Sequence, residues 1–199
     1  MDADLNLLLE ELERFGTAND DGIARGDPAQ AQRMLNITRD TGELLAVLVR
    51  ATRARDILEL GTSNGYSALW LADALGAEGG KVTTVELQDT KYAMALENFA
   101  RGGLRDRIDA LNADAGEVLR MAGDAAYDLV FLDSDRAQYE GWWPEIRRVL
   151  RPRGLLVVDN AISHAHEMAA FVQAVKEDGF TCSLVPVGKG EFLATRSTG

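Results

Sequence analysis

Glu59-Leu60-Gly61-Thr62-Ser63-Asn64-Gly65-Tyr66-Ser67 is the stretch that decides the fold. Its first two residues end a short apolar run at residues 57–60, and a helical pattern follows it at residues 68–75. A glycine at the end of a strand lets the backbone turn sharply and lets a ligand approach it closely. We therefore expect a strand, a ligand-binding turn and a helix, which is the first unit of an α/β domain.

Strand and helix patterns continue to alternate from this turn to the end of the chain. The further strands are expected at residues 81–86, 108–113, 127–133, 154–159, 182–187 and 192–195. The further helices are expected at residues 92–99, 115–121 and 144–150, and after a capping Ser163. Such alternation predicts crossover units and a parallel sheet. The expected fold is α/β and doubly wound, with a mostly parallel seven-stranded sheet and an antiparallel C-terminal edge hairpin.

Two helices are expected before this core. The first has an apolar stripe formed by Leu5, Leu8, Leu9 and Leu12. It is expected to end near Phe15, before a loop at residues 16–28 that is rich in Gly, Asp and Asn. The second is expected at residues 38–51. These N-terminal helices would pack as a cap against the core.

The chain length and charge limit the function. A length of 199 residues suits one domain, expected over residues 1–199, with a helical extension at 1–52 and a cofactor-binding core at 53–199. The formal charge of −11 describes a surface that repels nucleic-acid phosphates. A small-molecule substrate is therefore expected, and nucleic acid is not.

Location signals are missing from the sequence. Cys182 is the single cysteine, which excludes an intrachain disulfide and disfavours a secreted scaffold. The start, Met1-Asp2-Ala3-Asp4, lacks the basic region of a signal peptide. No apolar stretch approaches the roughly 20 residues of a membrane span. We therefore expect a cytoplasmic protein that does not associate with membranes.

The turn after the first strand carries an acid and two glycines. Gly61 and Gly65 give Gly-x-x-x-Gly, and the third glycine of the dinucleotide pattern is missing. Glu59 precedes the turn, where a carboxylate would repel a pyrophosphate and attract a cation. S-adenosylmethionine carries a sulfonium and an ammonium group. The pattern therefore favours this cofactor over a dinucleotide.

Polar residues also follow the next two strands. Glu86 ends the second strand, where a carboxylate can accept hydrogen bonds from ribose hydroxyls. Asp114 and Ala115 follow the third strand, where an adenine edge would lie. Taken singly, Glu59 and Glu86 could be ordinary surface acids, and Asp114 a helix cap. Because these residues end successive strands, one nucleoside would contact the whole set.

With these residues in view, the chain resembles the class I S-adenosylmethionine-dependent O-methyltransferases of the cation-dependent catechol and caffeoyl-CoA type. The likeness covers about residues 34–196. It rests on Ile37-Thr38, on residues 59–67, on Val-Phe-Leu-Asp-Ser-Asp at 130–135 and on Val-Val-Asp-Asn at 157–160. The resemblance implies a Rossmann-like enzyme that methylates the hydroxyl of a small, aromatic or catechol-like substrate.

The resemblance also implies roles for individual residues. Contacts with S-adenosylmethionine are implied for Glu59, Gly61, Ser67, Glu86, Ala115 and Asp135. The expected cofactor site also includes, from the same region, Thr62, Ser63, Gly65, Asp114 and Asp133. Binding of a divalent cation is implied for Asp133, Asp159 and Asn160.

The residues themselves agree with a cation site. Asp133 ends the fourth expected strand and Asp159-Asn160 end the fifth, so parallel neighbours would place them side by side. Two carboxylates and an amide form an oxygen ligand set suited to Mg²⁺, Mn²⁺ or Ca²⁺. Such a cation would bind two vicinal oxygens of a catechol-like substrate and lower the hydroxyl pKa. Alternatively, Asp159 and Asn160 only form a turn before the next helix.

The chain departs from the family pattern near these residues. The family usually has a lysine three positions after the first metal aspartate, where this chain has Arg136. A guanidinium stays protonated, so Arg136 cannot be a general base, and we expect it to act with Asp133 through electrostatic assistance. The segment after Asn160 is also short for the family, which disfavours a large acyl-CoA substrate.

Four other residues have two interpretations each. His164 and His166 could serve as base or ligand, although solvent-facing positions in a first helical turn are expected. Trp142 and Trp143 could line a substrate pocket, although core or interface positions are more common for such a pair. Neither pair is assigned to the site.

Two other functions stay open. An NAD-dependent oxidoreductase would need the missing glycine and usually a second domain. A non-catalytic adenosyl-binding module would be compatible with Arg136 and the short loop. The family likeness also suggests a homodimer, which the apolar N-terminal helix could support.

Overall fold

The computed structural model describes residues 2–24 and 26–196, so residues 1, 25 and 197–199 of the expected domain lie outside it. Its helices are α1 (Ala3–Asp21), α2 (Arg39–Thr52), α3 (Tyr66–Ala74), α4 (Asp89–Arg101), α5 (Ala115–Met121), α6 (Tyr139–Val149) and α7 (Ala169–Glu177). Its strands are β1 (Asp56–Leu60), β2 (Lys81–Glu86), β3 (Ile108–Asn112), β4 (Tyr127–Leu132), β5 (Leu150–Val158), β6 (Phe180–Val185) and β7 (Glu191–Arg196).

The strands of the described residues form one seven-stranded sheet in the order β3-β2-β1-β4-β5-β7-β6. Strands β1 to β5 pair in parallel, whereas β7 is antiparallel to both β5 and β6. The strand order reverses between β1 and β4, where Glu59 of β1 is paired with Phe131 of β4. The doubly wound fold with a C-terminal hairpin is therefore confirmed, with β7 inserted between β5 and β6.

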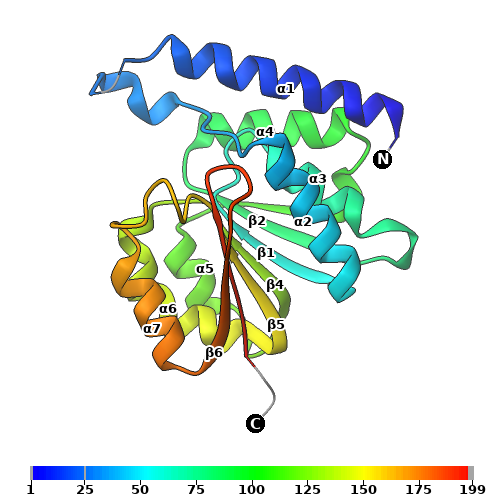
Figure 1. The fold of residues 1–199 in the computed structure, drawn as a ribbon. Coiled ribbons are helices and arrows are strands. Elements are labelled where there is room, and N and C mark those ends of the chain that lie inside the picture. The colour runs from blue at the N-terminus through cyan, green and yellow to red at the C-terminus, as the bar shows by residue number, and fades with distance from the viewer. Residues whose placement is uncertain (1, 25, 197–199) are drawn as a thin grey trace.

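Helices cover both faces of the sheet (Figure 1). On one face α2, α3 and α4 pack with α1, which crosses over α3 and α4 at one end of the molecule (Figure 1). On the other face α5, α6 and α7 pack around Tyr139, Ile146 and Phe171. Both faces of the central strands are covered, which explains the continuous apolar run in β4. Each fully buried Leu or Phe contributes roughly 1.5–3 kcal/mol to stability.

Helix α1 is longer than expected and ends at Asp21 rather than near Phe15. Gly16 was expected to begin a loop, but it lies within the helix and is buried. A Cβ atom at this position would lie 2.7 Å from Nδ2 of Asn36, so the glycine permits a close approach of the following segment. Tertiary packing here outweighs the weak helix propensity of glycine.

Three expected boundaries in the second half of the chain are wrong. Helix α6 begins at Tyr139, and Pro144 lies inside it, at an exposed position where water can satisfy the carbonyl that loses its N–H partner. Strand β5 begins at Leu150 rather than at residue 154. Ser163 does not cap α7, which begins at Ala169. The backbone of Ser163 instead donates to the carbonyl of Lys189.

The described helices include none that is both long and apolar enough to cross a membrane.

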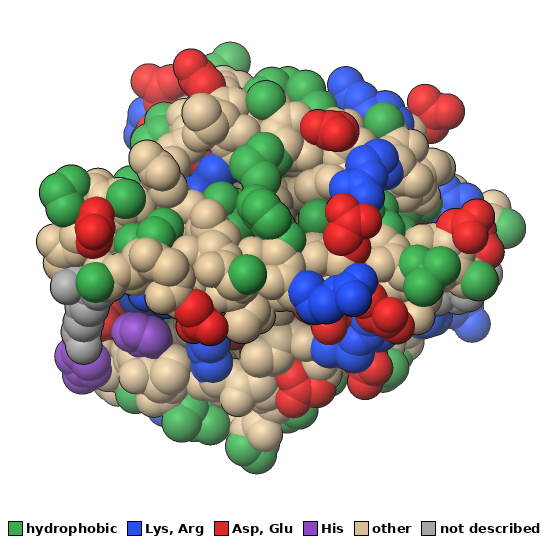
Figure 2. Space-filling model, turned by 90° about the horizontal axis from the view of Figure 1, so that it is seen from above, with side chains coloured by type: hydrophobic (Ala, Val, Ile, Leu, Met, Phe, Trp, Pro, Cys, Tyr) green, Lys and Arg blue, Asp and Glu red, His purple; other side chains and the backbone are tan. Residues whose placement is uncertain are grey.

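Figure 2 views the molecule from the end that carries α1. Acidic and basic side chains are interspersed on this face, and the two histidine side chains lie together at one edge.

Candidate active site

A large cavity of about 1030 Å³ opens at the carboxyl ends of the parallel strands. Its walls come from the turn after β1, the residues that follow β2, β3 and β4, and the loop after β5. The segment between α1 and α2 lines it from the N-terminal side, through Arg33, Met34 and Leu35. This is the position at which doubly wound sheets bind their ligands.

Gly61 sets the shape of the turn after β1. Its φ of +108° lies in the region that favours glycine, and a Cβ atom would lie 2.1 Å from the carbonyl oxygen of Asp133. The Gly61 and Thr62 amides both donate to the carbonyl of Val85, at 3.0 and 3.2 Å. The turn is therefore held tightly between β2 and β4, and the structure permits only glycine at its start.

Glu86 is held at the cavity wall by backbone donors. It is 8% exposed, and its carboxylate accepts hydrogen bonds from the amides of Ser63 at 2.8 Å and of Gln88 at 2.9 Å. Ser63 and Glu86 both line the cavity. These two bonds fix the orientation of the carboxylate and leave its other lone pairs for a ligand.

Glu59 is fully buried, with 0% exposure, beneath the turn. It accepts a hydrogen bond from the hydroxyl of Thr84 at 2.5 Å and another from Ser67. Burial, and secondarily the charge of Glu86, raises its pKa from 4.5 to about 7. Its Oε1 atom has no hydrogen-bond partner within the part of the chain that the structure describes.

The structure thus brings the two predicted acids to one end of the sheet, but only Glu86 reaches the cavity. The described residues that line the cavity do not include Glu59, Thr62, Gly65 or Ser67. All four are buried, and Thr62 and Gly65 belong to the turn itself. Their contact with the cofactor stays a prediction.

Asp114, Ala115 and Asp135 all line the cavity, as expected for cofactor contacts. Asp114 also caps α5 by accepting a hydrogen bond from the amide of Glu117 at 2.9 Å. Asp135 accepts one from the amide of Ala137 at 3.2 Å, at the start of a short 3₁₀ helix. The capping interpretation of Asp114 is therefore correct, and it is compatible with a place in the cavity wall.

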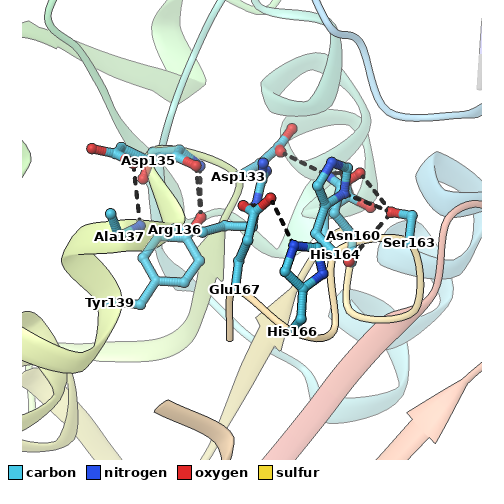
Figure 3. Close-up of polar contacts among 12 residues, drawn as sticks. Asp133, Asp135, Arg136, Ala137, Tyr139, Asn160, Ser163, His164, His166 and Glu167 are labelled. Carbon is cyan, nitrogen blue, oxygen red and sulfur yellow. Dashed lines mark hydrogen bonds and ion pairs between the residues drawn. The ribbon is translucent and has the colours of Figure 1, made fainter. Parts of the chain in front are cut away.

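Asp133, Asp159 and Asn160 meet at the ends of β4 and β5. The Asn160 amide nitrogen donates to Asp159 at 2.6 Å. It also lies 3.4 Å from a carboxylate oxygen of Asp133 (Figure 3). Asp133 and Asn160 line the cavity, whereas Asp159 is buried behind them. Burial and the adjacent charges of Asp159 and Glu59 raise the pKa of Asp133 well above its ordinary value. Two crowded acids of this kind favour the presence of a cation.

The three residues have the chemistry of a hard-cation site. If the Asn160 amide turns by 180°, its oxygen replaces the nitrogen beside both carboxylates and completes a set of oxygen ligands. Among the described residues, however, no group of three or more His, Cys, Asp or Glu side chains is arranged to hold a metal ion. Any cation site here therefore depends on Asn160 together with the two aspartates.

The rim of the cavity near this cluster is charged. Arg136 donates from Nε to Glu167 at 2.6 Å (Figure 3), so its charge is partly compensated within the chain. His164 lines the cavity, half-buried, with Nδ1 2.9 Å from the hydroxyl of Ser163. Burial and the positive charge of Arg136 lower its pKa, which favours the neutral imidazole.

The expectations for the histidine and tryptophan pairs are each half correct. His166 is 82% exposed, as expected, but His164 faces the cavity. Trp143 is a core residue that donates to Asp178 at 2.6 Å, whereas Trp142 lines the cavity. Residues one or two positions apart on a helix or turn point in different directions, so each pair divides between two environments.

Sequence reasoning missed the N-terminal wall of the cavity. Met34 is held there by the Ser63 hydroxyl, which donates to its carbonyl at 2.6 Å. Arg33 is held by Lys91, whose ammonium donates to its carbonyl at 2.7 Å. Both contacts join segments far apart in sequence, and the residues carry no periodic pattern that could have indicated them.

Comparisons with known proteins give the family. The family model described as O-methyltransferase matches residues 6–196. A protein of Mycobacterium sp. (strain JLS), named as an O-methyltransferase, is 36% identical over 174 residues, covering 80% of this chain and 79% of the relative. The catechol O-methyltransferase of Mycobacterium tuberculosis is 33% identical over 140 residues, covering 70% of this chain and 63% of the relative.

A solved structure of a similar protein agrees with this family. A Klebsiella pneumoniae protein named as an O-methyltransferase superposes with a TM-score of 0.80 and 26% identity, covering 100% of this chain and 91% of that one. The chain therefore belongs to the O-methyltransferase family and is an S-adenosylmethionine-dependent methyltransferase of that family.

Proposed function

We propose that this methyltransferase acts on a hydroxyl of a small, catechol-like aromatic compound and that a divalent cation assists it. The observation that carries the proposal is the position of two sets of residues in one cavity. Glu86 lies in the wall beside the turn after β1, and Asp133 with Asn160 lies in the wall at the ends of β4 and β5. A donor and an acceptor bound at these two places would share one continuous space.

The cofactor half of the cavity would be formed by Glu86, Ser63, Asp114, Ala115 and Asp135. When bound, S-adenosylmethionine supplies a methyl group on a positively charged sulfur. The fixed carboxylate of Glu86 would accept hydrogen bonds from ribose hydroxyls, since its orientation is already set by two backbone amides. Asp114 and Ala115 would border the adenine. Glu59 would support the turn from behind, and its unpaired Oε1 atom would be available to the positively charged part of the cofactor.

The acceptor half would be formed around Asp133, Asp159 and Asn160. Their oxygen atoms suit Mg²⁺, Mn²⁺ or Ca²⁺. When bound, the cation lowers the pKa of an acceptor hydroxyl and orients two vicinal oxygens. Arg136 would stabilise negative charge on the acceptor at the rim, and His164, as a neutral imidazole on the same wall, would accept a proton. The catechol O-methyltransferase among the relatives supports a vicinal diol as acceptor.

A transfer assay tests this proposal. The full chain is incubated with methyl-labelled S-adenosylmethionine and catechol, with Mg²⁺ or with a chelator, and phenol replaces catechol as the monohydroxy control. We expect labelled product from catechol with Mg²⁺, much less from phenol, and loss of transfer with the chelator. Transfer that survives the chelator would remove the cation from the mechanism. Cofactor binding without transfer to any acceptor would favour a non-catalytic module.

We also propose that the chain is a homodimer, as the family likeness suggests. The apolar stripe of α1 does not support this, because Leu5, Leu8, Leu9 and Leu12 pack into the core of their own chain. Exposed apolar side chains remain on α1 at Leu7 and Phe15. Light scattering after size-exclusion chromatography measures the molar mass and separates a dimer from a monomer.

A further inference from the structure

Glu191 is a buried acid that the proposed mechanism does not use. It begins β7 and is 0% exposed. One carboxylate oxygen accepts a hydrogen bond from the hydroxyl of Thr41 at 2.9 Å. The other, Oε2, has no hydrogen-bond partner anywhere in residues 2–24 and 26–196. An unpaired oxygen of a buried carboxylate is costly, so a positive charge or a hydrogen-bond donor beside it would be favourable.

The neighbours of Glu191 are the acids of the proposed cation site. Asp159 follows Val158 of β5 and Glu191 precedes Phe192 of β7, and because these two strand residues are antiparallel partners, the two acids lie side by side. The charge of Asp133 also acts on Glu191. Three acids are therefore gathered where only two were expected. A divalent cation beside them would offset this accumulation of negative charge.

Contacts from two sides fix the position of Glu191. From α2, Thr41 contacts the carboxylate itself, and Asp40 accepts a hydrogen bond from the amide of Gly188 at 3.1 Å. From the loop after β5, the amide of Ala161 donates to the carbonyl of Gly190 at 2.7 Å. The β6–β7 turn is thus held between the start of α2 and the segment that carries Asn160. This arrangement keeps Glu191 directed at Asp159.

We propose that Glu191 is a positioning residue of the cation site, which lies beside Asp159 and adds a negative charge that strengthens binding of a divalent cation. The inference rests on the cation in the proposed function. Glu191 is not assigned as a direct ligand, because the described acids do not by themselves form a metal-binding group of three. Its effect is transmitted through Asp159 and through the electric field at the site.

Manganese binding to the full chain tests this inference without any measurement of activity. Free Mn²⁺ is titrated by electron paramagnetic resonance against the wild type, Glu191→Gln and Glu191→Asp. Glu191→Gln keeps the shape and an acceptor for Thr41 but removes the charge. We expect it to weaken Mn²⁺ binding at least tenfold, and we expect Glu191→Asp, which keeps the charge, to restore most of the affinity. The matched control Glu177→Gln removes an exposed charge at the end of α7 and should leave Mn²⁺ binding unchanged.

The outcomes separate this inference from the proposed function. If the wild type binds Mn²⁺ and folded Glu191→Gln binds it equally well, the role of Glu191 is wrong and the cation site stands. If both Glu191 variants are weakened equally, shape rather than charge matters, and the inference is again wrong. If the wild type binds no Mn²⁺, the cation itself is removed from the proposed function, and the inference falls with it. Thermal melting of each variant confirms that it is folded.

Discussion

Glu86→Gln is the substitution that examines the cofactor half of the cavity most sharply. In the wild type each carboxylate oxygen accepts a hydrogen bond from a backbone amide, one from Ser63 and one from Gln88. Glutamine has the same shape, but it places an NH₂ group where one of these oxygens was. That group faces an N–H donor, so one backbone bond is lost and the side chain turns. The negative charge that would attract ribose hydroxyls is lost as well.

The size of the effect follows from these bonds. A hydrogen bond to a charged group contributes about 1.5–3 kcal/mol. Each 1.4 kcal/mol corresponds to a factor of about ten in affinity. If one ribose bond loses its charged acceptor, we expect the dissociation constant for S-adenosylmethionine to rise about 10- to 100-fold. Because Glu86 is nearly buried, solvent screening should reduce this effect only slightly.

Isothermal titration calorimetry measures the change, with S-adenosylhomocysteine as ligand and without an acceptor or metal ion. The matched control is Glu97→Gln, which removes an exposed carboxylate from α4. Circular dichroism melting establishes that both variants are folded. A folded Glu86→Gln protein that binds the ligand within threefold of the wild type would refute the assignment of this wall to the ribose.

Three further predictions concern the turn and the acids around it. Gly61→Ala should unfold in less urea than the wild type and bind S-adenosylhomocysteine at least tenfold more weakly, because its Cβ would lie 2.1 Å from the Asp133 carbonyl oxygen; equal urea midpoints would contradict this. Asp159→Ala should abolish cation-dependent transfer but change cofactor affinity only a few fold, as measured by calorimetry, and a collapse of cofactor binding in the folded variant would oppose our placement of Asp159. Because burial raises the pKa of Glu59 to about 7, the folded protein binds the Glu59 proton more tightly than the unfolded chain does. This proton binding stabilises the folded state fully below about pH 4.5, and the stabilisation is lost as the pH rises through 7. Urea unfolding of the ligand-free wild type should therefore show a fall in the free energy of unfolding of up to about 3 kcal/mol between pH 5 and 8, and Glu59→Gln should not show this fall. Identical pH profiles of the two proteins would count against this prediction.

Most of the fold could be predicted because its signals are local. Apolar runs, β-branched residues and glycine turns indicated all seven strands, and the family motifs lie at strand ends as expected. The errors occur where distant contacts decide a boundary. Gly16 remains helical because Asn36 packs against it, and the segment at Ser163 forms turns because its backbone bonds to the β6–β7 turn. Neither contact leaves a pattern in the sequence near the residue concerned.

The candidate site was predictable to a similar degree. Strand ends in a parallel sheet meet at one edge, which is why Glu86, Asp133 and Asn160 could be brought together from the sequence. The depth of a side chain could not be predicted in the same way. Glu59 is buried beneath the turn, with one carboxylate oxygen unpaired among the described residues, and its contact with the cofactor stays a prediction. Glu191 begins an antiparallel strand, and its approach to Asp159 depends on the strand order β5-β7-β6, which the sequence did not specify.

The most direct measurement is a crystal structure of the full chain with S-adenosylhomocysteine. We predict density for the adenosyl group in the cavity at the carboxyl ends of the parallel strands, with both ribose hydroxyls within hydrogen-bond distance of Glu86 and the homocysteine sulfur directed towards Asp133. Ligand density outside this cavity, or a ribose with no contact to Glu86, would contradict the account.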